Sequence, residues 1–114
     1  MKRRHEAKGD LLGSLEEQVL LAVVRTGDAA YGMSVRRELE TVTERDIAIG
    51  AVYATLDRLE SKGLVTSARP ETAAEGPSRR VFTLTPTGAR SLALTRGVRE
   101  RLWFGVKLEP LVDT

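Results

Sequence analysis

The stretch AIGAVYATLDRLESKGLV, residues 48–65, carries the clearest structural pattern in this chain. Val52, Leu56 and Leu59 recur at helical spacing, and Lys62-Gly63 is a typical helix end ahead of Leu64. The opposite side of the predicted helix carries Gly50, Ala54, Asp57, Arg58 and Ser61. Because most of these side chains are small, DNA could approach the helix backbone closely. We therefore interpret this segment as a DNA-recognition helix.

Two helices are predicted before this segment. Residues 14–27 read as the first, with Ser14 and Glu17 as a capping box and Gly27 as its end. Its apolar stripe consists of Leu15, Val19, Leu20, Ala22, Val23 and Val24. Residues 31–42 read as the second helix, and its expected orientation places Met33, Leu39 and Val42 inward and Arg36 and Arg37 outward.

A hairpin and a fourth helix are predicted after it. Residues 64–69 and 79–85 are rich in Val, Thr and Phe, as strands are, and a loop with two prolines and a glycine separates them. Thr85 caps the last helix and Pro86 occupies its first position. This order predicts a mainly α fold with a small β-hairpin wing (α+β), a winged helix-turn-helix with a C-terminal dimerisation helix.

The composition limits the function. The chain has 114 residues, 41% of them hydrophobic, which suits one small domain. It contains no cysteine and only one histidine, His5, so that a thiolate zinc site or a nucleophile–base pair lacks its parts. We expect no enzyme, no metal and no cofactor. Without a long apolar run or a signal peptide, the chain is expected to be soluble and cytoplasmic, with no membrane partner.

Positive charge gathers at the two ends of the chain. The net charge is +2, and it divides into +2 for residues 1–13, −2 for 14–69 and +2 for 70–114. We divide the chain into a basic leader (1–13), a winged helix-turn-helix domain (14–85) and a C-terminal dimerisation helix with a tail (86–114). The uneven charge favours an anionic partner weakly.

Four pieces of sequence resemble the PadR family of bacterial transcriptional regulators. They are LEEQVLLAV near the start, AYG at 30–32, IGAVYATLDRLESKGLV at 49–65 and GPSRRVFTLTPTG at 76–88. The segment at 49–65 is similar to the family pattern Gly-x-x-Tyr-x-x-Leu-x-x-Leu-Glu-x-x-Gly-Leu. The resemblance implies a homodimeric DNA-binding regulator, usually a repressor and often responsive to a small molecule. Ala48-Ile49 replaces the family's frequent Ser-Pro, and Ala51 its Thr or Ser, so that two polar side chains that could contact DNA are absent.

Under this interpretation the partner is an operator in double-stranded DNA. The expected DNA-binding positions are Gly50, Tyr53, Ala54, Arg58, Ser78, Arg79, Arg80, Arg36, Arg37 and Lys8. The resemblance favours a contact between the Tyr53 hydroxyl and a phosphate over a partly buried core role. Arg58 is expected either to read a guanine edge or to form a surface ion pair. Strand alternation points Arg79 and Arg80 to opposite faces, so that one of the two should face DNA.

The last helix shows two apolar faces on a helical wheel. One consists of Leu94, Val98, Leu102 and Val106, and the other of Ala89, Leu92, Ala93, Trp103 and Phe104. Two faces predict two neighbours, the chain's own domain and the same helix of a second copy, and therefore a homodimer. Trp103 is interpreted as an interface anchor, with a role in binding a small hydrophobic or aromatic effector as the alternative.

A winged helix that binds another protein instead of DNA is the rival function. The sparse outer face of the recognition helix and the −2 charge of residues 14–69 suit such an adaptor. Arg79, Arg80 and the basic leader favour DNA, because an adaptor would not need them.

Overall fold

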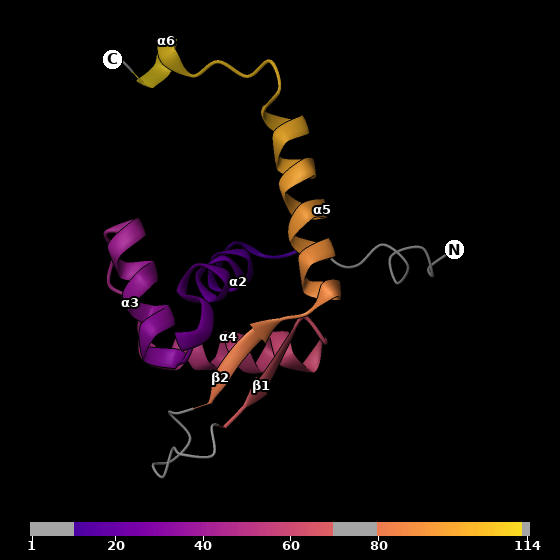
Figure 1. The fold of residues 1–114 in the computed structure, drawn as a ribbon. Helices are drawn as coiled ribbons and strands as arrows, with labels where there is room; N and C mark the ends of the chain where they lie inside the picture. Colours follow the sequence, from indigo (N-terminus) through magenta and orange to yellow (C-terminus); the bar gives the residue numbers. More distant parts are fainter. Residues whose placement is uncertain (1–10, 70–79, 113–114) are drawn as a thin grey trace.

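The computed structural model describes residues 11–69 and 80–112 (Figure 1). Its elements are α2 (Ser14–Thr26), a 3-10 turn (Gly27–Ala29), α3 (Gly32–Thr43), α4 (Ile49–Ser61), β1 (Val65–Ala68), β2 (Val81–Leu84), α5 (Pro86–Trp103) and α6 (Glu109–Val112). The element order confirms the predicted winged helix-turn-helix. Among the described residues, no helix combines the length and the hydropathy that a membrane span requires.

The core lies between α2, α3, α4 and the hairpin. Leu20 of α2, Leu56 and Leu59 of α4, and Phe82 of β2 are fully buried there, and Leu64 joins them just after α4. The predicted inward positions of α4 are thus confirmed. Gly63 has φ +77°, a left-handed conformation that glycine adopts without strain, and it turns the chain from α4 into β1.

The start of α2 differs from the prediction. The cap residue is Gly13, whose backbone N–H donates a hydrogen bond to the Oε1 atom of Glu16 at 3.0 Å. The predicted capping box of Ser14 and Glu17 is therefore wrong by one residue. Gly13 has no side chain to return the bond. Along the helix Val24 is 50% exposed, since it lies at the edge of the stripe that faces the core.

The orientation of α3 agrees with the prediction for Leu39 and differs from it for Met33 and Val42. Val35 and Leu39 are buried, whereas Met33 is 37% exposed and Val42 57% exposed. Met33 lies nearly opposite Val35 on a helix with 100° per residue, so that both cannot face the core. Val42 is on the core side but in the last turn, where α2 covers it only partly.

The turn between α3 and α4 holds the two helices in place. Glu44 adopts a left-handed conformation (φ 58°, ψ 36°) at the end of α3. The Oε2 atom of Glu40 accepts a hydrogen bond from the backbone N–H of Ile47 at 2.8 Å, and this bond, with Arg36 beside it, lowers the pKa of Glu40. The helix-turn-helix is thereby fixed just ahead of α4.

The hairpin is antiparallel, with Val65 opposite Leu84 and Ala68 opposite Val81. Its other side is tied to the helices because the backbone N–H of Phe82 donates to the carbonyl of Ala30 at 2.8 Å. Thr85 accepts a hydrogen bond from the N–H of Gly88 at 3.0 Å, which confirms the predicted cap of α5.

The last helix is shorter than predicted. It ends at Trp103, and Gly105 (φ +80°) turns the chain toward the short helix α6, which was not predicted. Phe104 and Val106 therefore do not continue either face of α5. The part of α5 buried in its own domain is small and partly polar, consisting of Gly88, Ser91 and Thr95, instead of a second large apolar face.

Candidate nucleic-acid interface

The outward face of α4 is a low stripe, which we define as Gly50, Ala54, Asp57 and Ser61. All four residues are exposed. A Cβ atom added to Gly50 would meet nothing within 4 Å, and the backbone there does not have a positive φ. Neither packing nor backbone conformation inside the domain therefore requires glycine at position 50. A surface that another molecule approaches closely does provide a reason for it.

Tyr53 lies beside this stripe, but its hydroxyl points away from solvent. A Cβ atom on Gly32, the first residue of α3, would lie 2.3 Å from the Cζ atom of Tyr53, so that the ring occupies the space that glycine leaves open. The hydroxyl is buried and has no hydrogen-bond partner among the described residues. This packing explains the glycine at position 32. In this conformation the hydroxyl does not reach a phosphate.

Arg58 points toward α2 and not along the stripe. Its Nε atom lies 3.3 Å from the Oε2 atom of Glu16, which also accepts a hydrogen bond from Lys62 Nζ at 2.9 Å. Burial by itself would raise the pKa of Glu16, but the Gly13 backbone N–H and the two cations outweigh this effect, and the pKa is lowered. Of the two alternatives for Arg58, the structure shows the ion pair, with a partner that the sequence did not indicate.

Arg80 lies between the wing and α4. Its Nη2 atom donates to Asp57 Oδ1 at 2.9 Å, and its Nη1 atom to Glu60 Oε1 at 3.3 Å. The guanidinium carbon lies 4.9 Å from the centre of the Phe82 ring, and Glu60 also accepts a hydrogen bond from Ser67 of β1 at 2.8 Å. Arg80 thus links the hairpin to α4 and offsets two carboxylates, instead of extending freely toward phosphates.

The other predicted phosphate contacts divide into two groups. Arg36 is paired with Glu40 at 3.3 Å, while Arg37 is exposed and has no ion-pair partner among the described residues. Ser78, Arg79 and Lys8 lie outside the described residues.

Two further exposed arginines were not among the predicted phosphate contacts. Arg45, in the turn before α4, and Arg69, just after β1, are both exposed and lack an ion-pair partner within residues 11–69 and 80–112. Their positions directly before the predicted recognition helix and directly after the first predicted strand could have indicated them as phosphate contacts.

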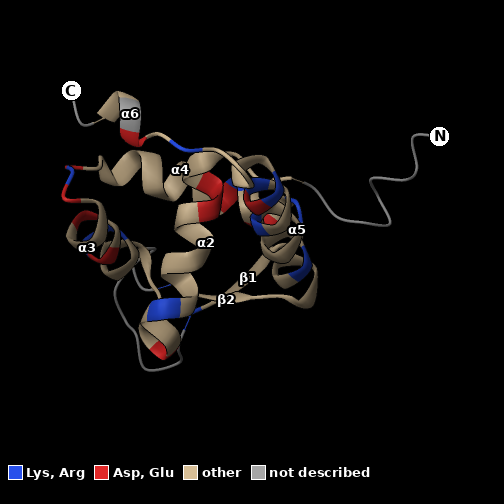
Figure 2. Cartoon of the chain, turned by 90° about the horizontal axis from the view of Figure 1, so that it is seen from above, with Lys and Arg blue, Asp and Glu red and all other residues tan. Residues whose placement is uncertain are grey.

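Acidic residues of α2 face basic residues of α5 (Figure 2). Arg99 Nη1 lies 2.7 Å from an oxygen of Glu17, and the backbone N–H of Leu12 donates to Thr95 Oγ1 at 3.0 Å. Glu16 and Glu17, adjacent in sequence, therefore bind α4 and α5 respectively. The start of α2 connects the recognition helix to the last helix.

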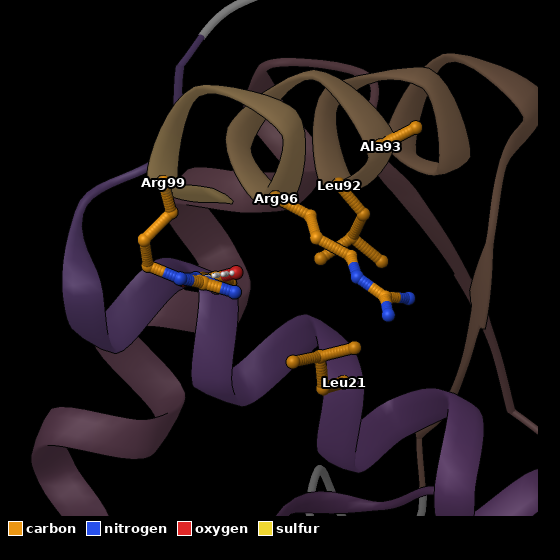
Figure 3. Close-up of a pocket in the computed structure, with 6 residues that line it drawn as sticks. Leu21, Leu92, Ala93, Arg96 and Arg99 are labelled. Carbon is orange, nitrogen blue, oxygen red and sulfur yellow. Dashed lines mark hydrogen bonds and ion pairs between the residues drawn. The ribbon is translucent and has the colours of Figure 1, made fainter. Parts of the chain in front are cut away.

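A pocket of about 330 Å³ opens between α2 and α5 (Figure 3). Its lining consists of Glu17, Leu21, Leu92, Ala93, Arg96 and Arg99. Leu21, Leu92 and Ala93 provide an apolar part, with the two guanidinium groups beside it. Trp103 does not line this pocket.

The predicted interface residues of the C-terminal helix are only partly covered. Leu94 and Val98 are half-buried, whereas Leu102 is 73% and Trp103 54% exposed. Val106 lies beyond the helix and is also exposed. No group of three or more potential metal ligands occurs within the part of the chain that the structure describes.

These elements define a winged helix-turn-helix protein, with α3 and α4 as the helix-turn-helix and the β1–β2 hairpin as the wing. The chain belongs to the PadR-like family of transcriptional regulators, because the model of that family matches residues 20–94. A search of curated proteins finds no match.

Solved structures share the fold. RosR of H. salinarum is 23% identical, with a TM-score of 0.66 over 84% of this chain and 81% of that one. F93 from STIV, described as a winged-helix DNA-binding protein, is 16% identical, with a TM-score of 0.67 over 86% and 100%. A PadR family transcription regulator of Clostridium difficile R20291 is 24% identical, with a TM-score of 0.54 over 78% and 86%. Identities this low support the fold alone.

Proposed function

We propose that the protein is a homodimeric, sequence-specific DNA-binding repressor whose α4 enters the major groove. The low stripe of α4 carries this proposal, above all Gly50, which nothing inside the domain requires. Arg37, Arg45 and Arg69 are exposed, without ion-pair partners among the described residues, and are the described side chains that we assign to phosphates. Membership of a transcriptional regulator family supports the same function.

Exposed apolar side chains near the C-terminus support the proposed dimer. Leu102, Trp103 and Phe104 are 73%, 54% and 88% exposed, and Leu111 and Val112 are 73% and 70% exposed. Adjacent apolar residues exposed to this extent are typical of a protein interface. A second copy related by a two-fold axis would cover them and would present two recognition helices to two half-sites.

The experiment measures binding to DNA from the upstream region of the protein's own gene, with random DNA of equal length as the control, at two salt concentrations. We expect a preference for the upstream fragment. If the dimer neutralises about six phosphates, its affinity should fall roughly a thousandfold between low and moderate salt. A failure to bind either DNA at low salt would refute the function, and a monomer in sedimentation experiments would refute the dimer.

Release of the repressor by a small molecule is part of the proposal. The pocket between α2 and α5 offers an apolar surface to a small hydrophobic or aromatic effector, beside Arg96 and Arg99, which pair with Glu100 and Glu17 respectively. Since Glu17 lines this pocket and Glu16 binds Arg58 and Lys62 of the α4 end, an occupied pocket could shift α4 through α2. Binding of such a compound, measured by calorimetry, together with loss of DNA binding would support this step.

A protein-binding adaptor is the second candidate. Arg58 and Arg80, the predicted cations nearest the low stripe of α4, are engaged in ion pairs, and the charged residue of the stripe itself is Asp57. These two observations favour the adaptor. Retention on heparin in a salt gradient separates the two functions, because an adaptor should elute early.

A further inference from the structure

The stripe on α4 contains one charged residue, and it is an acid. Gly50, Ala54, Asp57 and Ser61 fall within about 60° of each other around a helix of 3.6 residues per turn. The side chain of Asp57 is 63% exposed. A carboxylate in this position would be repelled by the phosphates of approaching DNA unless something offsets its charge.

Arg80 supplies that charge and also fixes the carboxylate. Its Nη2 atom binds Asp57 Oδ1 at 2.9 Å, while its own side chain is only 28% exposed and lies over Phe82. The ion pair therefore approaches Asp57 from the hairpin side. No described residue donates a hydrogen bond to Oδ2, so that this oxygen of a largely exposed side chain is free to accept one.

An ionised carboxylate only accepts hydrogen bonds. In the major groove the donors are the amino groups of cytosine and adenine, whereas guanine N7 and O6 and thymine O4 are acceptors. Aspartate pairs characteristically with cytosine N4, while asparagine pairs with adenine through its N6 and N7 atoms. The chemistry of Asp57 thus selects one kind of base edge.

We propose that Asp57 is a specificity-determining residue that accepts a hydrogen bond from N4 of a cytosine in each half-site, with Arg80 as the residue that positions it. This inference rests on the proposed function, since it requires α4 to lie in the major groove. It changes the role of Arg80 from a phosphate contact to a support for base recognition.

Glu60 provides the matched control. It shares Arg80 with Asp57 and belongs to the same helix, but its side chain is 35% exposed and is held by Ser67 of β1. Glu60 thus faces the hairpin. Its replacement by glutamine removes the same charge next to the same arginine without altering the stripe.

Preferred binding sites are selected from a randomised DNA pool, separately with the wild-type protein and with the variants Asp57→Ala, Asp57→Asn and Glu60→Gln. Affinities are then measured for the wild-type site and for its single-base-pair substitutions. For the wild type we expect a cytosine preference at one position of each half-site, of roughly 5- to 150-fold. Asp57→Ala should abolish it, Asp57→Asn should shift it toward adenine, and Glu60→Gln should retain it.

Two further measurements separate recognition from a structural role. Asp57→Ala should bind random DNA as tightly as the wild type or more tightly, because a negative charge is removed near phosphates. Arg80→Ala should reduce discrimination at the cytosine position more than at any other position, whereas a merely structural loss would weaken all positions alike. Thermal unfolding confirms that each variant is folded.

The inference is overturned if Asp57→Ala selects the same site with the same discrimination as the wild type, or if the position that it affects prefers another base. A wild-type protein that selects no site at all would overturn the proposed function and this inference with it. The two failures are distinguishable, because a wild-type protein that selects a site supports the proposed function even when the Asp57 inference fails.

Discussion

Replacing Gly50 by alanine should make the protein more stable and its DNA binding weaker. An added Cβ atom would meet nothing within 4 Å, so that the free domain accepts it without a clash. Alanine in place of glycine stabilises the interior of a helix by about 0.5–1 kcal/mol, and Gly50 is the second residue of α4, so that we expect a gain near the lower end of this range. For a domain of this size the melting temperature should rise by about 2–4 °C.

Gly50→Ala should lower the affinity for DNA although it raises the stability. If α4 lies against the groove at Gly50, the new methyl group occupies space that DNA would fill, and overpacking of a close contact costs about 1–3 kcal/mol. The affinity should therefore fall about 5- to 150-fold. Melting by circular dichroism and fluorescence anisotropy with a labelled DNA fragment measure the two effects.

Gly97→Ala in α5 is the matched control. Its added Cβ atom would lie 3.4 Å from the flexible end of the Arg101 side chain, and position 97 is outside the helix-turn-helix. This variant should be folded and should bind DNA like the wild type, with sedimentation to verify its oligomeric state. If Gly50→Ala is stabilised but binds DNA with unchanged affinity, close approach at Gly50 is refuted.

Other variants test the contacts around this surface. Gly32→Ala should destabilise the domain by about 1–3 kcal/mol in urea unfolding, because its Cβ atom would lie 2.3 Å from the Tyr53 ring, and full stability would show that the ring moves easily. Tyr53→Phe should unfold at the same or a higher urea concentration, since it removes a buried hydroxyl without a described partner; weaker DNA binding by this variant would restore the predicted phosphate contact. Glu16→Gln should lower stability at neutral pH by about 1–3 kcal/mol. The pKa of Glu16 is lowered in the folded state, so its stabilisation is present above the ordinary glutamate pKa and is lost as the pH falls through the lowered value. Acid unfolding should therefore be less steep for Glu16→Gln, and identical pH profiles would contradict this role. Leu102→Glu should convert a dimer into monomers in sedimentation, and a dimer that persists would place the interface elsewhere.

The elements and their order could be predicted from the sequence. Local signals specify them: the spacing of Val52, Leu56 and Leu59, the turn at Gly63, and the cap formed by Thr85 ahead of Pro86. These signals act within a few residues, so that they can be read from the chain. The low stripe of α4 was also visible, because helical periodicity alone separates it from the buried side.

The partners of the charged and aromatic side chains could not be predicted in this way, because they lie on elements distant in the chain. Arg58 binds Glu16, 42 positions earlier, and Arg80 binds Asp57, 23 positions earlier. Both arginines are suitable phosphate ligands by type. Their partners come from other elements that the fold brings within about 3 Å, and no sequence spacing encodes that proximity. Position in the fold, not residue type, therefore changed Arg80 from a DNA contact into a link between the wing and the recognition helix.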